Sequence, residues 1–225
     1  MKNYLGAKSA SGTPQAVINL MPPHDTYIEP FLGTGAILSR KAPALTSYGV
    51  DKNKRCVDGF NCTAAGGIIH LICGDAFEFL LNFDFENSGQ VLVYLDPPYI
   101  NETRTGNKRY EFDFTDDDHR RLLALIKQLP CHVILSGYDN NLYNEELTGW
   151  FTTKWRAMTR GGARWEKVWC NFEPAEIHYH TYAGQDRTDR QRIKRKAERW
   201  VNKIRAMPPS ERQAVVAAIL TSQLE

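Results

Sequence analysis

Short apolar runs, separated by stretches with helical signals, constrain the fold of this 225-residue chain more than any other feature. Val91–Leu95 is apolar throughout, without the alternation of a half-exposed strand, so this run is expected to be buried on both faces. Strands that alternate with helices predict an α/β fold with a mostly parallel sheet and right-handed crossovers. The predicted strands of this sheet are Tyr27–Glu29, Tyr48–Asp51, Ile68–Cys73, Val91–Leu95 and His132–Ser136.

The segment between the fourth and fifth runs predicts a helix. Thr115 is a suitable N-cap, and the three aspartates that follow it favour the positive end of the helix dipole. Leucine and isoleucine then recur at helical spacing until Pro130. After Gly149 the pattern changes to aromatic and β-branched residues, which predicts an antiparallel hairpin over residues 150–172.

We divide the chain into a catalytic domain, residues 1–174, and a helical C-terminal extension, residues 175–225. In the last helix we expect Ser210 and Gln213 to form a capping box. The segment Arg187–Arg205 contains nine Lys or Arg and two acidic residues, so its net charge is +7, which leaves −5 for the rest of a chain whose net charge is +2. This segment predicts either a polyanionic partner or a solvated helix surface.

Composition is that of a water-soluble protein. Apolar residues make up 42% of the chain, but the longest apolar runs are too short to cross a bilayer. Five cysteines lack the spacing of a metal site, so we expect reduced thiols and no structural zinc. We expect a cytoplasmic protein without a membrane partner, and the sequence does not predict an oligomeric state.

The loop after the first predicted strand carries two glycines, Gly33 and Gly35, and leads towards a helix. Glycines let a backbone turn tightly and approach a ligand closely. Asp51 ends the next strand, where acids of nucleotide-binding folds accept hydrogen bonds from ribose hydroxyls. Leu38 stands where a third glycine of a pyrophosphate loop would be, which favours a nucleoside ligand without phosphates. S-Adenosyl-L-methionine (AdoMet) is such a ligand. Asp75 after the third strand is either a cofactor ligand or a helix N-cap.

Asp96-Pro97-Pro98-Tyr99 follows the most buried strand, where open α/β sheets bind ligands. The alternative interpretation is a rigid turn with a capping aspartate. The residue types suit methylation of an exocyclic adenine amine, whose lone pair is delocalised into the ring. Asp96 and the carbonyl of Pro97 can accept hydrogen bonds from its two N–H groups, and Tyr99 offers a face for a flipped base. Such a site acts by positioning and electrostatics and requires no metal.

These motifs resemble those of the Dam-like group of N6-adenine DNA methyltransferases. The similarity covers residues 1–172 and includes Gly6-Ala7-Lys8, the segment from Glu29 to Gly35, Asp96-Pro97-Pro98-Tyr99 and the segment from Gly161 to Val168. It implies a Rossmann-like AdoMet-dependent methyltransferase fold and a double-stranded DNA substrate. It implies catalytic roles for Asp96, Pro97 and Tyr99, and AdoMet binding by Tyr4, Lys8, Glu29, Phe31, Gly33, Gly35, Asp51 and Asp75.

The chain departs from this group in two places. Gly6-Ala7-Lys8 replaces the usual Gly-Gly-Lys, and only residues 80–90 separate the Asp75 element from the Asp-Pro-Pro-Tyr strand, where relatives commonly carry a target-recognition domain. We therefore expect a short or relaxed recognition sequence. The residues expected to contact nucleic acid are Arg104, Lys108, Arg109, Arg160, Arg164, Arg192, Lys194 and Arg195.

Three alternatives remain open. The first is a methyltransferase with another target. Cytosine N4 enzymes usually carry Ser at the position of Asp96, and protein glutamine methyltransferases usually carry Asn, so Asp favours adenine. An RNA adenine is a second target, because a flipped base is the same in both polymers. A DNA-binding protein without activity is the third alternative, and the intact Asp96, Tyr99 and Asp51 argue against it.

Overall fold

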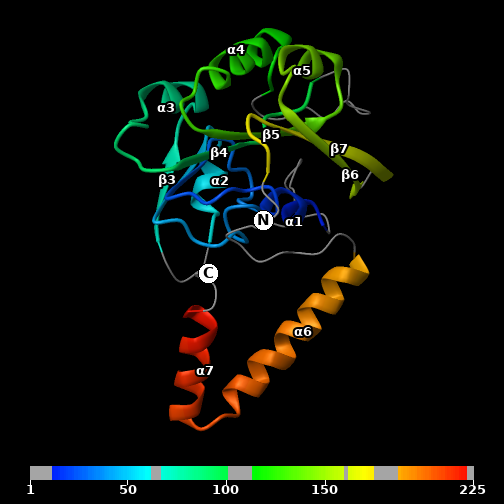
Figure 1. Ribbon diagram of the computed structural model, residues 1–225. Coiled ribbons are helices and arrows are strands. Elements are labelled where there is room, and N and C mark those ends of the chain that lie inside the picture. Colours follow the sequence, from blue (N-terminus) through cyan, green and yellow to red (C-terminus); the bar gives the residue numbers. More distant parts are fainter. Residues whose placement is uncertain (1–11, 62–66, 101–112, 160–161, 175–186, 222–225) are drawn as a thin grey trace. The chain divides into compact units, whose positions relative to one another are not determined.

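The computed structural model describes residues 12–61, 67–100, 113–159, 162–174 and 187–221. It divides the chain into two compact units, Met1–Tyr182 and Ala183–Glu225. The predicted boundary between residues 174 and 175 stays a prediction. The first unit contains a seven-stranded sheet with helices on its faces (Figure 1), and the second is a helical hairpin.

The sheet has the order β3-β2-β1-β4-β5-β7-β6. Its strands are β1 (Thr26–Glu29), β2 (Thr46–Asp51), β3 (Ile68–Cys73), β4 (Val91–Leu95), β5 (His132–Tyr138), β6 (Phe151–Thr159) and β7 (Gly162–Cys170). The pairs among β1 to β5 are parallel, whereas β7 is antiparallel to both β5 and β6. The predicted α/β architecture, a mostly parallel sheet with an antiparallel hairpin, is confirmed.

The helices of the first unit are short. They are α1 (Thr13–Ile18), α2 (Lys54–Asp58), α3 (Ala76–Asn82), α4 (Asp116–Ile126) and α5 (Asn141–Glu146). Thr115 caps α4 as predicted, in a reciprocal capping box with Asp118. Leu122, Leu123 and Ile126 of this helix pack with the apolar side chains on one face of the sheet. A second cluster, which includes α1 and the segment after β1, covers the other face.

Strand β4 lies between β1 and β5 and is buried along its whole length, as the apolar run predicts. The strand order reverses here, since the chain continues from β1 to β2 in one direction and from β4 to β5 in the other. In open α/β sheets such a reversal of strand order is where ligands bind, beyond the carboxyl ends of the strands, here those of β1 and β4. The loops after these two strands carry the predicted site residues.

The second unit contains α6 (Arg187–Arg205) and α7 (Pro209–Thr221), which contact each other. The prediction that Ser210 and Gln213 form a capping box is wrong, because α7 begins one residue earlier, at Pro209. Proline suits a first helical position, since the amide it lacks has no partner within the helix. In the part of the chain that the structure describes, no helix combines the length and apolar character needed to span a membrane.

Candidate active site

The loop after β1 and the end of β2 are joined by hydrogen bonds. The backbone N–H of Gly33 donates to Oδ2 of Asp51 at 2.7 Å, and that of Asn53 donates to Oδ1 at 2.8 Å. Burial raises the pKa of Asp51, although these bonds act in the opposite direction. The predicted pair Gly33 and Asp51 is therefore in direct contact, so one nucleoside can reach both.

Gly35 shows why this loop requires glycine. Its φ is +62°, a left-handed conformation, and an added Cβ atom would lie 2.2 Å from the ring of Phe60. Any larger residue would meet both backbone strain and a clash. Gly33 has a φ of +51°. The two glycines therefore set the shape of the loop beside Asp51.

Glu29 ends β1 and lies beneath the loop. Its side chain is 3% exposed, and its Oε2 accepts hydrogen bonds from the Tyr27 hydroxyl and the Leu38 N–H, each at 3.0 Å. Burial raises the pKa of Glu29 to about 8, and the charge of Asp96 acts in the same direction. These contacts lie inside the protein, so they support a role for Glu29 in holding the loop in place. Its predicted contact with AdoMet stays a prediction.

Phe31, in the loop after β1, and Asp75, after β3, make different contacts. The ring of Phe31 meets that of Phe114 edge to face at 5.5 Å. Asp75 caps α3 through the N–H groups of Phe77 and Glu78, and Nζ of Lys52 lies 2.6 Å from its Oδ2. The N-cap interpretation of Asp75 is confirmed, and its role as a cofactor ligand stays a prediction.

Asp96 follows β4 and is held by a side chain from β5. The Ser136 hydroxyl donates to Oδ1 of Asp96 at 3.0 Å, and the hydroxyl of Tyr94 lies 2.9 Å from the same Ser136 oxygen. Tyr94 is fully buried and Ser136 is 1% exposed. The same hydroxyl also lies 3.2 Å from the carbonyl oxygen of Leu95, so its one proton has two acceptors, Asp96 and Leu95. Its lone pairs are then left for the Tyr94 hydroxyl, and Ser136 links Tyr94 with the end of β4 and with Asp96.

Tyr99 is held by residues of β5 and β7. Its ring centroid lies 4.3 Å from that of Tyr138, the last residue of β5, with 35° between the ring planes. Its hydroxyl donates to Oε1 of Glu166 at 3.4 Å, and Glu166 pairs with Tyr138 across β5 and β7. Pro97 is buried, which fixes the turn between Asp96 and Tyr99. The Asp-Pro-Pro-Tyr segment is therefore supported at both of its ends, at Asp96 by Ser136 and at Tyr99 by Tyr138 and Glu166.

The two halves of the site follow neighbouring strands, β1 and β4. The charge of Asp96 raises the pKa of Glu29, which shows that the ends of these strands are within electrostatic range of each other. Sequence reasoning did not identify Ser136, Tyr138 or Glu166 as site residues. The signal for Ser136 was its place at the end of the fifth predicted strand, because parallel pairing puts it beside the residue that follows Leu95.

Several predicted residues lie outside the described parts of the chain, namely Tyr4, Lys8, Arg104, Lys108, Arg109 and Arg160. Arg164 belongs to β7, and Arg192, Lys194 and Arg195 belong to α6 in the second unit. Of the two tryptophans beside the hairpin tip, Trp155 packs against the core, whereas Trp165 is 53% exposed.

Residues 68–158 match the family model of the D12 class N6 adenine-specific DNA methyltransferases. The match contains Asp75, Asp96, Tyr99 and Ser136, and it confirms the resemblance that the motifs indicated. No curated protein matches the chain.

Three solved methyltransferase structures have a similar backbone. A Pyrococcus horikoshii protein assigned as an RNA methyltransferase is 13% identical, with a TM-score of 0.43 over 75% of this chain and 85% of that one. The Synechocystis magnesium protoporphyrin IX methyltransferase, with bound SAM, is 14% identical, with a TM-score of 0.41 over 71% and 78%. A Plasmodium falciparum dimethyladenosine transferase is 14% identical, with a TM-score of 0.37 over 70% and 60%.

The fold itself is established by the order and directions of the strands. A parallel sheet ordered β3-β2-β1-β4-β5, extended by the reversed strand β7 and then β6, is the Rossmann-like methyltransferase fold that the resemblance implies. The family match over residues 68–158 and this fold both support methyltransferase activity.

Proposed function

We propose that this protein transfers a methyl group from AdoMet to the N6 amino group of an adenine that is flipped out of double-stranded DNA. The observation that carries the proposal is that the Asp96-Pro97-Pro98-Tyr99 segment, oriented by Ser136, and the loop that contains the Gly33–Asp51 contact follow neighbouring strands, β4 and β1. The family match to adenine-specific enzymes over residues 68–158 supports adenine as the target.

The substrate side of the site has the groups that an adenine amine needs. Oδ1 of Asp96 is oriented by Ser136, so the carboxylate is held in one position to accept a hydrogen bond from the amine. The carbonyl of Pro97 is the second acceptor. Two acceptors draw the nitrogen towards tetrahedral geometry and free its lone pair for attack on the methyl carbon. The proton that the nitrogen then loses has a carboxylate beside it.

Tyr99 provides the stacking surface for the base. Its ring packs on Tyr138 and its hydroxyl is bonded to Glu166, so the ring has little rotational freedom before the base arrives. A surface fixed in advance reduces the entropy lost on binding and keeps the amine aligned with the methyl donor.

The residues around the loop after β1 suit the nucleoside part of AdoMet. Asp51 lies where it can accept hydrogen bonds from the ribose hydroxyls, and the backbone of Gly33 and Gly35 allows a close approach. We assign Phe31 and Asp75 to the adenine ring of AdoMet, and Tyr4, Lys8 and Glu29 complete the proposed cofactor set. AdoMet supplies an activated methyl group, so the chain supplies orientation and local electrostatics.

DNA contacts are proposed for three groups of basic residues. Arg104, Lys108 and Arg109 follow the Asp-Pro-Pro-Tyr segment, and Arg160 and Arg164 lie at the hairpin tip. With Arg192, Lys194 and Arg195 of α6, they would bind phosphates and add affinity with little sequence information. A short or relaxed recognition sequence follows from this arrangement.

Transfer of label from methyl-labelled AdoMet to duplex DNA, single-stranded DNA and RNA tests the proposal. We expect label in duplex DNA, recovered as N6-methyladenine after hydrolysis. Asp96→Ala should abolish transfer and leave DNA affinity largely unchanged, because it removes an acceptor without removing a phosphate contact. Label in RNA alone would contradict the DNA assignment. Absence of transfer to every polymer would favour a DNA-binding protein without activity.

A further inference from the structure

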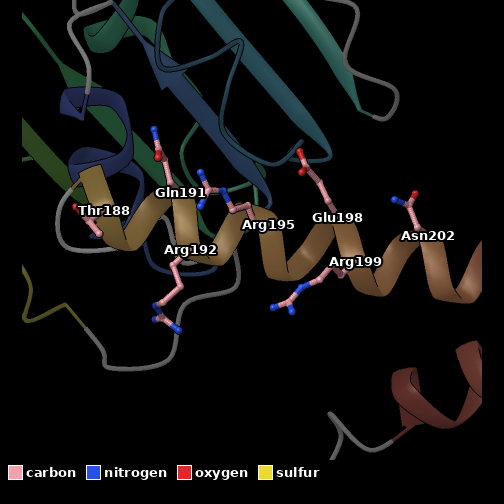
Figure 2. A pocket seen from close by; sticks show the side chains of 7 residues that line it. All are labelled: Thr188, Gln191, Arg192, Arg195, Glu198, Arg199 and Asn202. Carbon is pink, nitrogen blue, oxygen red and sulfur yellow. The ribbon is translucent and has the colours of Figure 1, made fainter.

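Helix α6 carries five of its nine basic residues along one side. Arg192, Arg195, Lys196, Arg199 and Lys203 recur at intervals of three and four residues, which in a helix of 3.6 residues per turn places them along one exposed face. Figure 2 shows Arg192 and Arg199 extending to the same side of α6, with Gln191, Glu198 and Asn202 on the other and Arg195 between them. We call Arg192, Arg195, Lys196, Arg199 and Lys203 the basic stripe.

The remaining cations of the helix are placed differently. Lys194 lies across the helix axis from the basic stripe, and its Nζ is 3.8 Å from Oε1 of Glu198 in an exposed ion pair. Arg205 falls on the same side as Lys194, by the helical repeat. A third side of the helix is apolar and includes Ile193 and Ile204, which are half-buried, while α6 contacts α7.

We propose that the basic stripe is a sequence-independent binding surface for the phosphodiester backbone of a nucleic acid. This inference deepens the proposed function and rests on it for the identity of the polymer. The stripe spans about 16 Å of helix, a length comparable to about five phosphates of one strand along a duplex axis. Arginine side chains bind phosphate oxygens in a bidentate manner, and three of the five residues are arginines.

Two contacts within α6 organise the stripe. Nζ of Lys203 lies 5.3 Å from the centre of the Trp200 ring, which keeps the ammonium group close to the helix surface. Arg192 is bonded to Asp189 at 2.6 Å, so its charge is partly neutralised before any ligand binds. We therefore expect Arg195, Lys196, Arg199 and Lys203 to contribute most of the phosphate affinity.

A membrane surface is the rival partner, because basic amphipathic helices also bind anionic lipid. The apolar side of α6 contains the half-buried Ile193 and Ile204, and also Trp200, which is 55% exposed and available to a membrane. The residues beside the stripe include Gln191 and Asn202, whose amides can hydrogen-bond to phosphate and sugar oxygens. These amides favour a nucleic acid, and the vesicle measurement below tests the membrane.

Two double variants of the full-length protein, each lacking two positive charges, test the inference. Lys196→Gln/Arg199→Gln alters the stripe, and Arg190→Gln/Arg205→Gln is the control with the same loss of charge, at positions that the helical repeat places away from the stripe. Affinity for fluorescent random-sequence duplexes, one of DNA and one of RNA, is measured without AdoMet from about 50 to 200 mM salt. Circular dichroism verifies that helix content is unchanged.

For the stripe variant we expect the slope of log affinity against log salt to shrink by about 2, and low-salt affinity to fall on the order of tenfold. The control should keep the wild-type slope. The same loss on DNA and RNA supports a backbone contact, and a loss on one duplex only would identify that polymer as the partner. Equal effects of both variants would overturn the inference.

Two further outcomes separate this inference from its rival and from the proposed function. If the stripe variant binds both duplexes like wild type but loses affinity for phosphatidylserine vesicles, the partner is a membrane and the inference is wrong. Methyl transfer is measured separately. If the wild-type protein transfers no methyl group, the proposed function is contradicted. If in the same experiments only the stripe variant binds with a smaller salt dependence than the wild type, this inference is supported.

Discussion

Asp51 is the last residue of β2 and Asp96 follows β4, so both lie at the carboxyl ends of parallel strands of the same sheet. The two carboxylates are held in different ways. Asp51 accepts hydrogen bonds from the backbone N–H groups of Gly33 and Asn53. Asp96 is held by the hydroxyl of Ser136, a side chain 40 residues away in the sequence. A backbone amide is present whatever the side chain, whereas a serine hydroxyl can be lost by one substitution.

This difference suggests separate roles for the two regions. The bonds of Asp51 join two loops, so its removal should disturb the shape of the proposed cofactor pocket. The bond of Ser136 orients one carboxylate, so its removal should leave the pocket intact and affect the reaction. The predictions that follow test this separation, from the largest expected effect to the smallest.

Asp51→Ala should lower AdoMet affinity on the order of 100-fold. The substitution removes the proposed ribose contact and leaves the amides of Gly33 and Asn53 without their carboxylate acceptor, and hydrogen bonds to charged groups contribute about 1.5–3 kcal/mol each. Isothermal titration calorimetry with AdoMet measures the effect. Unchanged affinity would show that Asp51 acts only within the protein.

Ser136→Ala should lower kcat about tenfold and leave the KM for AdoMet unchanged. The loss of one hydrogen bond to a carboxylate raises the activation free energy by about 1.5 kcal/mol or more when the bond stabilises only the transition state. Tyr94→Phe should have a smaller effect of the same kind, because Tyr94 contacts Ser136 and reaches Asp96 only through it. Steady-state kinetics measure both variants, and a parallel rise in the KM for AdoMet would contradict the separation of roles.

Glu29→Gln should flatten the pH dependence of stability. The folded protein keeps the Glu29 proton up to a pKa of about 8, whereas the unfolded chain loses it near 4.5. The unfolded state therefore binds fewer protons between these values, and the unfolding free energy of the wild type should fall with rising pH by up to about 1.4 kcal/mol per pH unit.

Urea denaturation between about pH 5.5 and 7.5 measures this slope, because that window lies between the two pKa values of Glu29. Burial lowers the pKa of Lys41 to about 8, so its change of charge falls above the window. Glutamine keeps the size and acceptor of the neutral acid, so the variant should remain folded. Equal slopes for wild type and Glu29→Gln would show that Glu29 is ionised in the folded protein.

The sheet could be predicted from the sequence because its strands are short apolar runs with clear turn signals. Val91–Leu95 and Ile68–Cys73 have the predicted bounds. The fifth strand continues two residues beyond Ser136, since Gly137 and Tyr138 pair with β7, and a Gly-Tyr-Asp sequence alone gives no sign of that partner. Helix α5 was not predicted, because its six polar-rich residues bury only Tyr143.

The site could be predicted less completely than the fold. Asp51, Gly33 and Asp96 belong to local motifs, and a motif is visible in one stretch of sequence. Ser136, Tyr138 and Glu166 reach Asp96 and Tyr99 only through strand pairing. Residues that support a motif from a distant strand require the register of the sheet, which local patterns do not contain.

The reversed strand β7 has a consequence for how this scaffold can change. Tyr138, the last residue of β5, pairs with Glu166, so Gly162–Trp165 pair only with β6 and extend about 13 Å beyond the end of β5. Insertions or deletions in this two-stranded arm would alter its reach without shifting any of the five parallel strands. New preferences for bases around the target could therefore evolve by changing the length of the arm, while the catalytic half of the sheet stays under separate selection.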